Sequence, residues 1–368
     1  MTIETTSAAF PLIDICGPPE QRGLQYGEQA REFILRALTN YKSAYAERNI
    51  SWEQACGLAS GFIPQLEKKE VELLTEVKAI AEGAGVDIAE ILTLNCRTEI
   101  LYGSGAKIDE PTDGCTGVIA LPSATANGHV LHGQNWDWRD ECGDTSIVLR
   151  IRPEKGPAIL TQTEAGNLAR CGMNEAGIAL TGNFLKCDKD NQPGGIPIPF
   201  VRRHILEQSN LSDAFSVVLE APKSFSTNLM ISDGAGEGIN FETVPGETFW
   251  LSPENGLLVH ANHFESIPAR VKLKDLGLEV APCSLYRSRR VRDRLSGLIG
   301  DLTLDHFTEV FSDRFGAPSA VCASPDTGPG GDTSSTVATI LMDVSERKMM
   351  VAPRPYLHRE YTEYRFEN

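Results

Sequence analysis

The chain has 368 residues, 41% of them hydrophobic, and a formal net charge of −16 at pH 7. A chain of this length and apolar content has ample material for a hydrophobic core. Because it is this acidic, we expect neither nucleic acid nor a membrane surface among its partners.

Further features lead us to expect a cytoplasmic protein. No apolar run approaches the roughly 20 residues that a transmembrane helix needs. The first residues show no basic segment followed by an apolar one, and the last residues do not resemble a peroxisomal address. The nine cysteines are an odd number and form no Cys-x-x-Cys pair. This pattern argues against a disulfide framework and against a structural zinc site.

The first hundred residues predict helices almost throughout. Apolar residues recur at helical spacing within 19–49 and again within 67–82, where two glycines end the pattern. Asp87 and Glu90 have the spacing of a capping box and predict the start of a third helix. A polar, proline-containing segment at 107–112 then predicts a loop.

Alternating apolar residues predict that strands dominate the remainder, joined by hairpins such as the one turning at Asn127-Gly128. The expected strands are 118–121, 129–134, 146–152, 158–163, 177–181, 226–232, 238–243, 248–251, 256–260, 335–343 and 347–352. The expected helices of this part are 199–208, 211–220, 284–298 and 303–313. Blocks of helices between antiparallel strands indicate an α+β fold in which helices pack on the faces of sheets.

Gly114 and Cys115 stand directly before the first of these strands. A cysteine thiol has a usual pKa near 8.5 and is mostly protonated at neutral pH, so a nucleophilic cysteine needs a base. His132 is one candidate base, because it is expected on the adjacent strand. Cleavage of the bond before Cys115 would provide another, because the freed α-amine, with a pKa of about 8, adjoins the thiol. Gly114 favours such a cleavage, since it has no side chain to obstruct attack on its carbonyl.

Several motifs occur together around Gly114 and Cys115. The run Asp-Gly-Cys-Thr at 113–116 is followed, after a short interval, by Gly-Gln-Asn-Trp-Asp-Trp at 133–138. Further motifs are Asn-Cys-Arg-Thr-Glu at 95–99, the segments 163–166 and 172–177, and Val-His-Ala-Asn-His at 259–263. Together these motifs resemble the acyl-CoA:isopenicillin N acyltransferase family of the N-terminal-nucleophile hydrolases, and the resemblance spans roughly residues 20–352.

The resemblance implies a precursor that cleaves itself between Gly114 and Cys115. Residues 1–114 would then form a helical α part and residues 115–368 a β part, which stay together as one structural domain. The fold that the resemblance implies is a four-layer αββα sandwich, in agreement with the α+β order of elements.

The resemblance also assigns roles to other side chains. Asp137 matches an acidic residue that helps to orient the freed α-amine, and Asn262 matches an asparagine that donates to an oxyanion. Asn135 and Trp136 are candidate pocket residues, although a tryptophan in a strand is commonly part of the core.

Ser226 and Thr227 align loosely with a hydroxyl near the nucleophile, and simple strand positions are an equal alternative for both. His260 and His263 invite a metal site, but their spacing on a strand-to-loop segment points them in different directions. No cluster of carboxylates and histidines completes such a site, so we expect no metal and no cofactor.

One position departs from the family pattern. Penicillin-forming members carry Ser-x-Cys-Arg near the C-terminal third, and Ala323 stands here at the position of the arginine. This substitution argues against a penicillin precursor as the substrate. Arg97 and Glu99 are interpreted as a structural ion pair that holds the two parts of the chain together.

The motifs predict an enzyme that takes an acyl group from a linear amide as a thioester on Cys115. With water as the acceptor it is an amidohydrolase; with an amine it is an N-acyltransferase, for which acyl-CoA is a candidate co-substrate. Two alternatives stay open: a non-catalytic binding relative that keeps the Gly114–Cys115 bond, and a conventional Cys–His hydrolase that uses His132. The expected partners are a small-molecule amide or acyl thioester and the two fragments of the precursor.

Overall fold

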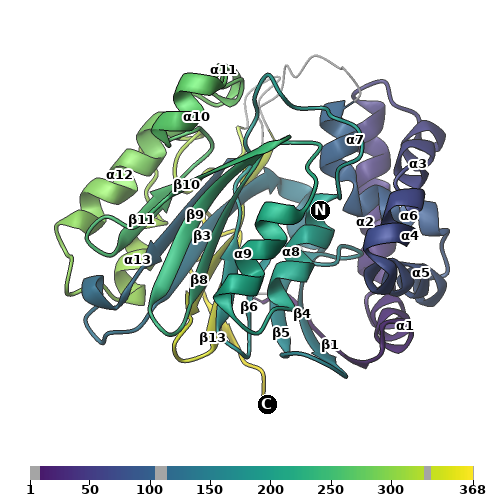
Figure 1. The fold of residues 1–368 in the computed structure, drawn as a ribbon, viewed down its shortest axis with the longest axis horizontal. Helices are drawn as coiled ribbons and strands as arrows, with labels where there is room; N and C mark the ends of the chain where they lie inside the picture. Colours follow the sequence, from purple (N-terminus) through teal and green to yellow (C-terminus); the bar gives the residue numbers. More distant parts are fainter. Residues whose placement is uncertain (1–8, 104–113, 327–332, 368) are drawn as a thin grey trace, which may run out of the picture.

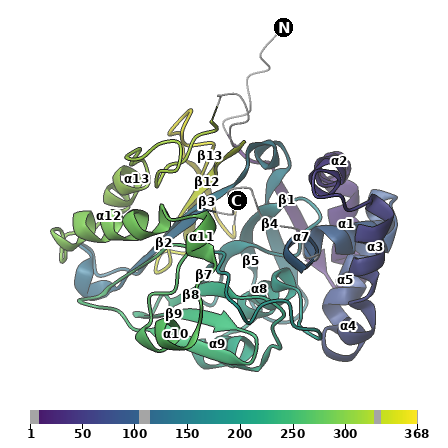
Figure 2. The ribbon, with the colours of Figure 1, turned by 90° about the horizontal axis from the view of Figure 1, so that it is seen from above.

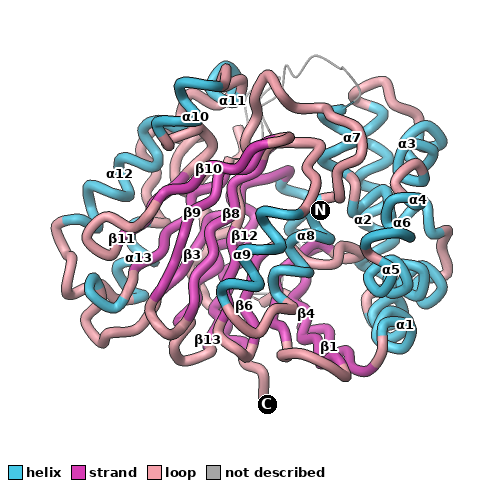
Figure 3. Tube along the Cα trace, in the orientation of Figure 1, coloured by secondary structure: helices cyan, strands magenta, loops and turns pink. Residues whose placement is uncertain are grey.

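The computed structural model describes residues 9–103, 114–326 and 333–367. Two β-sheets are stacked at the centre of the molecule, and helices cover their outer faces (Figures 1 and 2). Figure 3 shows the strands in the middle with helices on either side. This arrangement confirms the α+β, four-layer αββα sandwich expected from the sequence.

The larger sheet has eight strands in the order β1-β4-β5-β6-β7-β8-β9-β10. Their bounds are β1 (Leu12–Gly17), β4 (Ser146–Pro153), β5 (Ile159–Glu164), β6 (Cys171–Asn174), β7 (Ile178–Thr181), β8 (Thr227–Asp233), β9 (Glu237–Val244) and β10 (Glu247–Leu251). β1 runs parallel to β4, with Leu12 opposite Val148, and the other neighbours are antiparallel. Because β1 precedes the predicted cleavage site and β4 follows it, their pairing joins the two parts of the chain.

The smaller sheet has six strands in the order β11-β2-β3-β12-β13-β14. Their bounds are β11 (Leu257–His260), β2 (Cys115–Ala120), β3 (Leu131–Arg139), β12 (Ser334–Asp343), β13 (Lys348–Pro353) and β14 (Thr362–Tyr364). Cys115 lies opposite Trp136, and Asp137 lies opposite Thr336. The register therefore places the beginning of β2 beside the later half of β3, at one end of the sheet.

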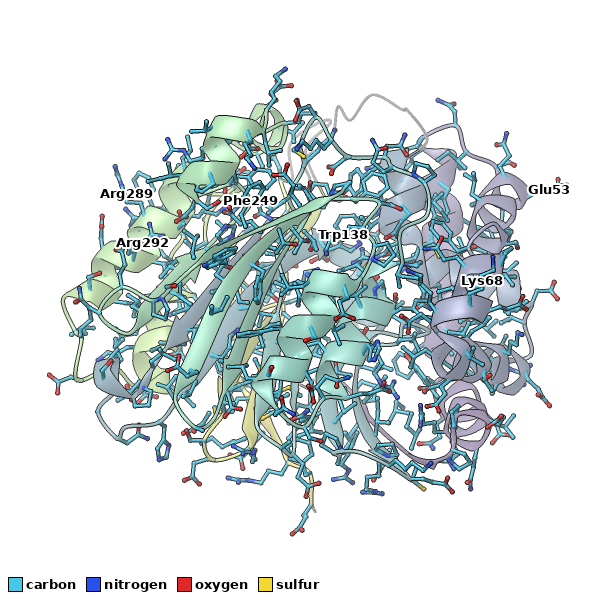
Figure 4. All side chains as sticks on the ribbon, in the orientation of Figure 1. Glu53, Lys68, Trp138, Phe249, Arg289 and Arg292 are labelled. Atoms are coloured by element: carbon cyan, nitrogen blue, oxygen red, sulfur yellow. The ribbon has the colours of Figure 1, made fainter. Side chains whose placement is uncertain are left out.

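The chain before Cys115 folds mainly into helices, which lie to the right in Figure 1. Their bounds are α1 (Pro19–Gln29), α2 (Arg31–Ala46), α3 (Trp52–Ser60), α4 (Ile63–Lys69), α5 (Val71–Ala84), α6 (Ile88–Asn95) and α7 (Arg97–Gly103). α1 and α5 approach closely, since a Cβ at Gly23 would lie 2.4 Å from the Glu76 carbonyl oxygen. Figure 4 shows Glu53 and Lys68 on the outer surface of this helical group.

The other helices cover the two sheets. Their bounds are α8 (Ile198–Leu206), α9 (Leu211–Glu220), α10 (Ile267–Lys272), α11 (Gly277–Val280), α12 (Ser284–Ser296) and α13 (Leu304–Val310), and short 3₁₀ turns lie at Pro122–Ala124 and Asp140–Asp144. α8 and α9 pack on the larger sheet, where Phe215 meets Phe241 edge to face. α12 and α13 pack on the smaller sheet, with Leu295 and Phe307 in one apolar cluster with Val118.

Several elements differ from the sequence prediction. No strand is predicted before residue 118, yet β1 forms one edge of the larger sheet, because its parallel partner lies far along the chain and leaves no local signal. The single helix predicted over 19–49 is two helices that meet at Ala30. α4, α10, α11 and β14 are unpredicted, since each has seven residues or fewer. The loop predicted at 107–112 lies outside the described residues.

All nine cysteines are free thiols in the structure. Six of them, Cys115 included, are buried, which is typical of cysteine as a small apolar residue. No helix within the described ranges is long and apolar enough to cross a membrane.

A buried carboxylate joins the helical part to the rest of the protein. Glu76 on α5 is fully buried and accepts hydrogen bonds from Arg22 on α1 and Arg203 on α8. Both contacts with Arg203 measure 3.0 Å and reach the two carboxylate oxygens, so this ion pair is bidentate. Because both arginines are buried, Glu76 balances their charge together with the half-buried Glu207.

We expect Glu76→Gln to lower the free energy of unfolding by about 3–5 kcal/mol, because it removes the carboxylate that buried guanidinium groups require. Chemical denaturation followed by circular dichroism measures this change. Glu72→Gln, on the exposed face of the same helix, is the matched control and should stay within about 0.5 kcal/mol of the wild type. Equal stability of the two variants would contradict the prediction.

Candidate active site

Cys115 is the first residue of β2, and its side chain is buried. Its main-chain N–H donates to Asn262 Oδ1 over 2.7 Å, and its carbonyl accepts from Arg287 Nη1 over the same distance. The Sγ lies 3.4 Å from Arg170 Nη2. Two side chains therefore hold the main chain of this cysteine, and a cation accompanies its sulfur.

Asn262 follows β11, whose antiparallel pairing with β2 brings it to Cys115. Its Oδ1 also accepts from Arg287 Nη2 over 2.8 Å, and its Nδ2 donates to the Phe184 carbonyl over 2.9 Å. These contacts determine that the oxygen of the carboxamide faces Cys115. One Nδ2–H is used by Phe184, and the second has no hydrogen-bond partner among residues 9–103, 114–326 and 333–367.

Asp137 stands beside the bond that the sequence predicts to be cleaved. A Cβ built on Gly114 would lie 2.9 Å from Asp137 Oδ2, closer than real side chains pack. The other carboxylate oxygen accepts from Thr336 Oγ1 over 2.6 Å, and that hydroxyl oxygen accepts from the Ala323 N–H over 2.8 Å. Ala323, the position that departs from the family pattern, is thus linked to Asp137 through Thr336.

Two buried arginines beside the candidate nucleophile are absent from the sequence prediction. Arg170 precedes β6, and its guanidinium lies 4.2 Å from the centre of the Trp136 ring. Arg287 on α12 is buried on the helix stripe that also carries Val291 and Leu295. That spacing is a signal that could have identified Arg287, because residues at i, i+4 and i+8 share one face. Arg170 comes from a loop and carries no comparable signal.

A cavity lies beside Arg170, bounded by α7, α8 and strands of the larger sheet. Three buried polar atoms of residues on its wall have no hydrogen-bond partner in the described part of the chain: Glu99 Oε2, Thr163 Oγ1 and Asn167 Nδ2. Such atoms cost free energy unless water or a ligand binds them. The cavity is therefore a candidate binding site beside Arg170, whose guanidinium contacts the Cys115 sulfur.

Ser226 and Thr227 both line this cavity. Ser226 Oγ donates to Asp190 Oδ1 over 2.5 Å, and Thr227 Oγ1 donates to the Asn183 carbonyl over 3.4 Å. The structure therefore brings these two hydroxyls to the cavity, where protein groups already bind them, and not to the thiol.

Asn135 and Trp136 differ in what they contact. Asn135 Nδ2 donates to the carbonyls of Phe311 and Val321 over 2.8 and 2.7 Å, and its Oδ1 accepts from Thr339. Asn135 thus ties the chain after α13 to the sheet. Trp136 is fully buried beneath the Arg170 guanidinium, so it belongs to the core and also supports the site.

His132 lies on β3 as predicted, but its register partner is Ile119, four residues along β2 from Cys115. At about 3.3 Å per residue, this offset amounts to roughly 13 Å. Its ring nitrogens each lie 2.9 Å from a hydroxyl of Ser232 or Thr181, between the sheets. Burial lowers the pKa of His132 to about 3. The ring is therefore neutral near pH 7 and is distant from the thiol.

His260 and His263 support the segment that carries Asn262. His260 Nε2 lies 2.9 Å from Glu242 Oε1, and His263 Nδ1 lies 2.7 Å from Ser284 Oγ. Burial opposes the charge of His260, but the Glu242 carboxylate raises its pKa above the ordinary value. Within the described ranges, no group of three or more His, Cys, Asp or Glu side chains could hold a metal ion.

Arg97 and Glu99 on α7 both contact the part of the chain that follows Cys115. Arg97 Nη2 lies 3.3 Å from Glu164 Oε2, and Glu99 Oε1 accepts from the Ile198 N–H over 3.3 Å. Burial raises the pKa of Glu99 to about 7, although the Ile198 N–H and the nearby arginines lower it. Arg97 and Glu99 thus reach the later part of the chain through separate partners, and the ion pair predicted between the two residues themselves stays a prediction.

Comparisons with known proteins found one matching family, similar sequences and similar structures. The family model described as acyl-coenzyme A:6-aminopenicillanic acid acyl-transferase matches residues 123–353. An acyl-coenzyme A:6-aminopenicillanic-acid-acyltransferase 40 kDa form from Emericella nidulans is 28% identical, covering 91% of this chain and 90% of that protein. A conjugated bile acid hydrolase variant from Clostridium perfringens is 16% identical with a TM-score of 0.48, covering 69% of this chain and 94% of that protein. Penicillin V acylase from Agrobacterium tumefaciens is 14% identical with a TM-score of 0.45, covering 65% of this chain and 83% of that protein.

We expect Glu99→Gln to reduce the loss of stability as pH rises. The pKa of Glu99 is raised from 4.5 to about 7, so the folded protein holds the proton of Glu99 more tightly than the unfolded chain does. The contribution of this protonation to the free energy of unfolding is therefore complete below pH 4.5 and is lost as pH rises through 7. Between pH 5 and pH 8, the wild type should lose up to about 3 kcal/mol more than the variant.

Urea denaturation at the two pH values measures the difference. Glu53→Gln, an exposed substitution on α3, is the control and should keep the wild-type dependence on pH (Figure 4). If Glu99→Gln loses as much stability as the wild type, the pKa of Glu99 is not raised in the folded protein.

Proposed function

Because the chain belongs to the acyl-coenzyme A:6-aminopenicillanic acid acyl-transferase family, we propose that it is a self-processing acyltransferase or amidohydrolase with Cys115 as its nucleophile. The proposal has two stages. The chain first cuts itself before Cys115, and the new N-terminal cysteine then takes acyl groups from small-molecule substrates.

Chain cleavage uses the thiol of Cys115 and the carbonyl of Gly114. The Sγ attacks the carbonyl carbon, and the C–N bond breaks as the thiol proton passes to the departing nitrogen. The acyl group of Gly114 is then held as a thioester on Cys115. Water hydrolyses this thioester, which leaves a carboxylic acid on Gly114 and a free thiol and α-amine on Cys115.

The observation that carries the proposal is the 2.7 Å hydrogen bond between the Cys115 nitrogen and Asn262 Oδ1. This nitrogen is the leaving atom in chain cleavage and the general base afterwards, so a fixed acceptor orients it in both stages. Asp137, whose carboxylate lies against Gly114, supports the same geometry, because an anion attracts and orients an α-ammonium.

In the processed enzyme the α-amine takes the thiol proton, and Sγ attacks the carbonyl carbon of an amide or acyl thioester. The second Nδ2–H of Asn262 is the proposed donor to the oxyanion, a contact typically worth about 3 kcal/mol. Collapse of the intermediate expels the leaving amine or thiol, which takes the proton, and leaves the acyl group on Cys115. Transfer to water makes the enzyme an amidohydrolase, and transfer to an amine makes it an N-acyltransferase.

The cavity beside Arg170 is the proposed acyl site. Its wall combines apolar side chains with the cationic groups of Arg97, Arg202 and Lys223, and three polar atoms on it lack partners in the described part of the chain. A mixed wall of this kind suits a small acyl group with a polar end. Acyl-CoA is the candidate thioester donor, since coenzyme A appears in the description of the family, and we propose no other cofactor.

Two alternatives differ in their support. A non-catalytic binding relative would keep the same fold with the Gly114–Cys115 bond intact. A conventional Cys–His hydrolase has less support, because the His132 ring lies against Ser232 and Thr181.

Purified wild-type protein should run on a denaturing gel as two fragments of about 12 and about 28 kDa, the shares of 114 and 254 residues in the 40.1 kDa chain. Intact mass measurement should identify Cys115 as the N-terminus of the larger fragment. Cys115→Ala should remain uncut, because it lacks the thiol, whereas the exposed-site control Cys16→Ala should be cut normally.

A single 40.1 kDa band from active wild-type protein would exclude self-processing. The same band from inactive protein would favour the non-catalytic relative. Cleavage of Cys115→Ala at the same bond would show that a separate protease is responsible.

Gly114→Ala should slow chain cleavage by at least about tenfold, because a methyl group 2.9 Å from Asp137 Oδ2 must displace either the carboxylate or the scissile bond. A time course of the two fragments after synthesis in a cell-free system measures the rate. Gly57→Ala on α3 is the control, since a Cβ there meets no atom within 4 Å. Cleavage of Gly114→Ala at the wild-type rate would refute the proposed contact.

A further inference from the structure

Arg287 is a fully buried residue whose guanidinium donates hydrogen bonds to Cys115, to the neighbouring Thr116 and to Asn262. Nη1 donates to the Cys115 carbonyl over 2.7 Å and to Thr116 Oγ1 over 2.9 Å. Nη2 donates to Asn262 Oδ1 over 2.8 Å. The planar guanidinium of Arg287, with its two forked nitrogens, therefore binds β2 and the segment after β11 at the same time.

No carboxylate in the described part of the chain forms an ion pair with Arg287. A buried charge without a counter-ion is costly, so this arginine is unusual among residues that only maintain a fold. Burial opposes its charge, but the neighbouring Cys283, Asp137 and Cys115 raise the pKa of Arg287. Two of these three groups, Asp137 and Cys115, belong to the candidate active site.

The fork also determines how Asn262 is oriented. A carboxamide can rotate by 180° and exchange its oxygen and nitrogen at similar steric cost. The Arg287 Nη2 and the Cys115 nitrogen both donate, so only the oxygen of Asn262 can face them. Without Arg287 one of these two donors is gone, and the preference for this orientation weakens.

We propose that Arg287 is a positioning residue for both stages of the reaction: it fixes Asn262 on the Cys115 nitrogen, and its charge favours the neutral amine and the thiolate. The inference rests on the proposed function and adds to it a residue that acts through Cys115 and Asn262. A nearby cation disfavours a second positive charge on the α-amine and favours a negative charge on sulfur. Both effects favour the nucleophilic form of the cysteine.

The other charged or titratable groups around Cys115 come from several elements. In the described part of the chain they include Asp137 on β3 and Arg170 before β6, together with three groups that act on Arg287 or Asp137: Cys283 at the start of α12, His263 after β11 and Cys322 before β12. All of them remain when Arg287 alone is replaced, so a change in pH dependence can be assigned to its charge.

The experiment compares Arg287→Lys and Arg287→Met with Arg289→Met. Arg289 lies on the same helix with an exposed side chain, as Figure 4 shows, and serves as the matched control. The rate of chain cleavage is followed on gels. The pH dependence of alkylation of Cys115 by iodoacetamide is measured on the processed protein by peptide mass.

Arg287→Lys keeps the charge but loses the fork, so we expect cleavage at least about tenfold slower with the midpoint of alkylation within about 0.5 pH unit of the wild type. Arg287→Met loses both the charge and the forked guanidinium, so we expect slow cleavage and a midpoint of Cys115 alkylation about one pH unit higher than in the wild type. Arg289→Met should match the wild type in both measurements.

Wild-type cleavage rates in Arg287→Lys, or an unshifted midpoint in Arg287→Met, would overturn the inference and leave the proposed function intact. An uncut wild type would instead refute the proposed function itself. Circular dichroism checks the folding of each variant, and if Arg287→Met does not fold, the cleavage rate of Arg287→Lys decides.

Discussion

The hydrogen bond from the Cys115 nitrogen to Asn262 Oδ1 joins β2 to the segment that follows its neighbouring strand, β11. Its geometry depends on contacts from several directions. The Ser284 hydroxyl accepts from the Asn262 N–H, the Phe184 carbonyl accepts from its Nδ2, and Arg287 donates to its oxygen. A carboxamide held at its main chain and at both of its side-chain ends has one available orientation, and this constraint positions the atom on which the proposed chemistry depends.

The contacts between the regions before and after the predicted cleavage site are buried and of different kinds. β1 is a parallel strand of the larger sheet, Glu76 binds Arg203, and Arg97 binds Glu164. The Tyr26 hydroxyl adds a hydrogen bond to the Asn167 carbonyl over 3.0 Å. Breaking the single peptide bond at Gly114 leaves all of these contacts in place. The structure therefore explains physically how two fragments would remain one folded unit.

Local sequence patterns predicted the elements that are long and strongly periodic, such as α5, α9 and β12. They missed β1 and the short helices, because a six-residue strand with a distant parallel partner, or a helix of one or two turns, has little periodicity of its own. In the site, the motif at 113–116 led to Cys115, and the resemblance led to Asp137 and Asn262. Arg287 was missed although its spacing with Val291 and Leu295 carries a signal, and Arg170 was missed because a loop residue has none.

By itself the sequence determined the α+β class, the family resemblance and the candidate nucleophile, since these follow from periodicity and from residues close together in the chain. The sequence also places a glycine directly before Cys115, and the absence of a side chain at Gly114 leaves room for Asp137. Only the tertiary structure decided that His132 lies away from the thiol, that the oxygen of Asn262 faces Cys115, and that two arginines surround it. The physical reason is that strand register and helix packing bring together residues far apart in sequence, and the orientation of a side chain depends on partners that no local pattern specifies.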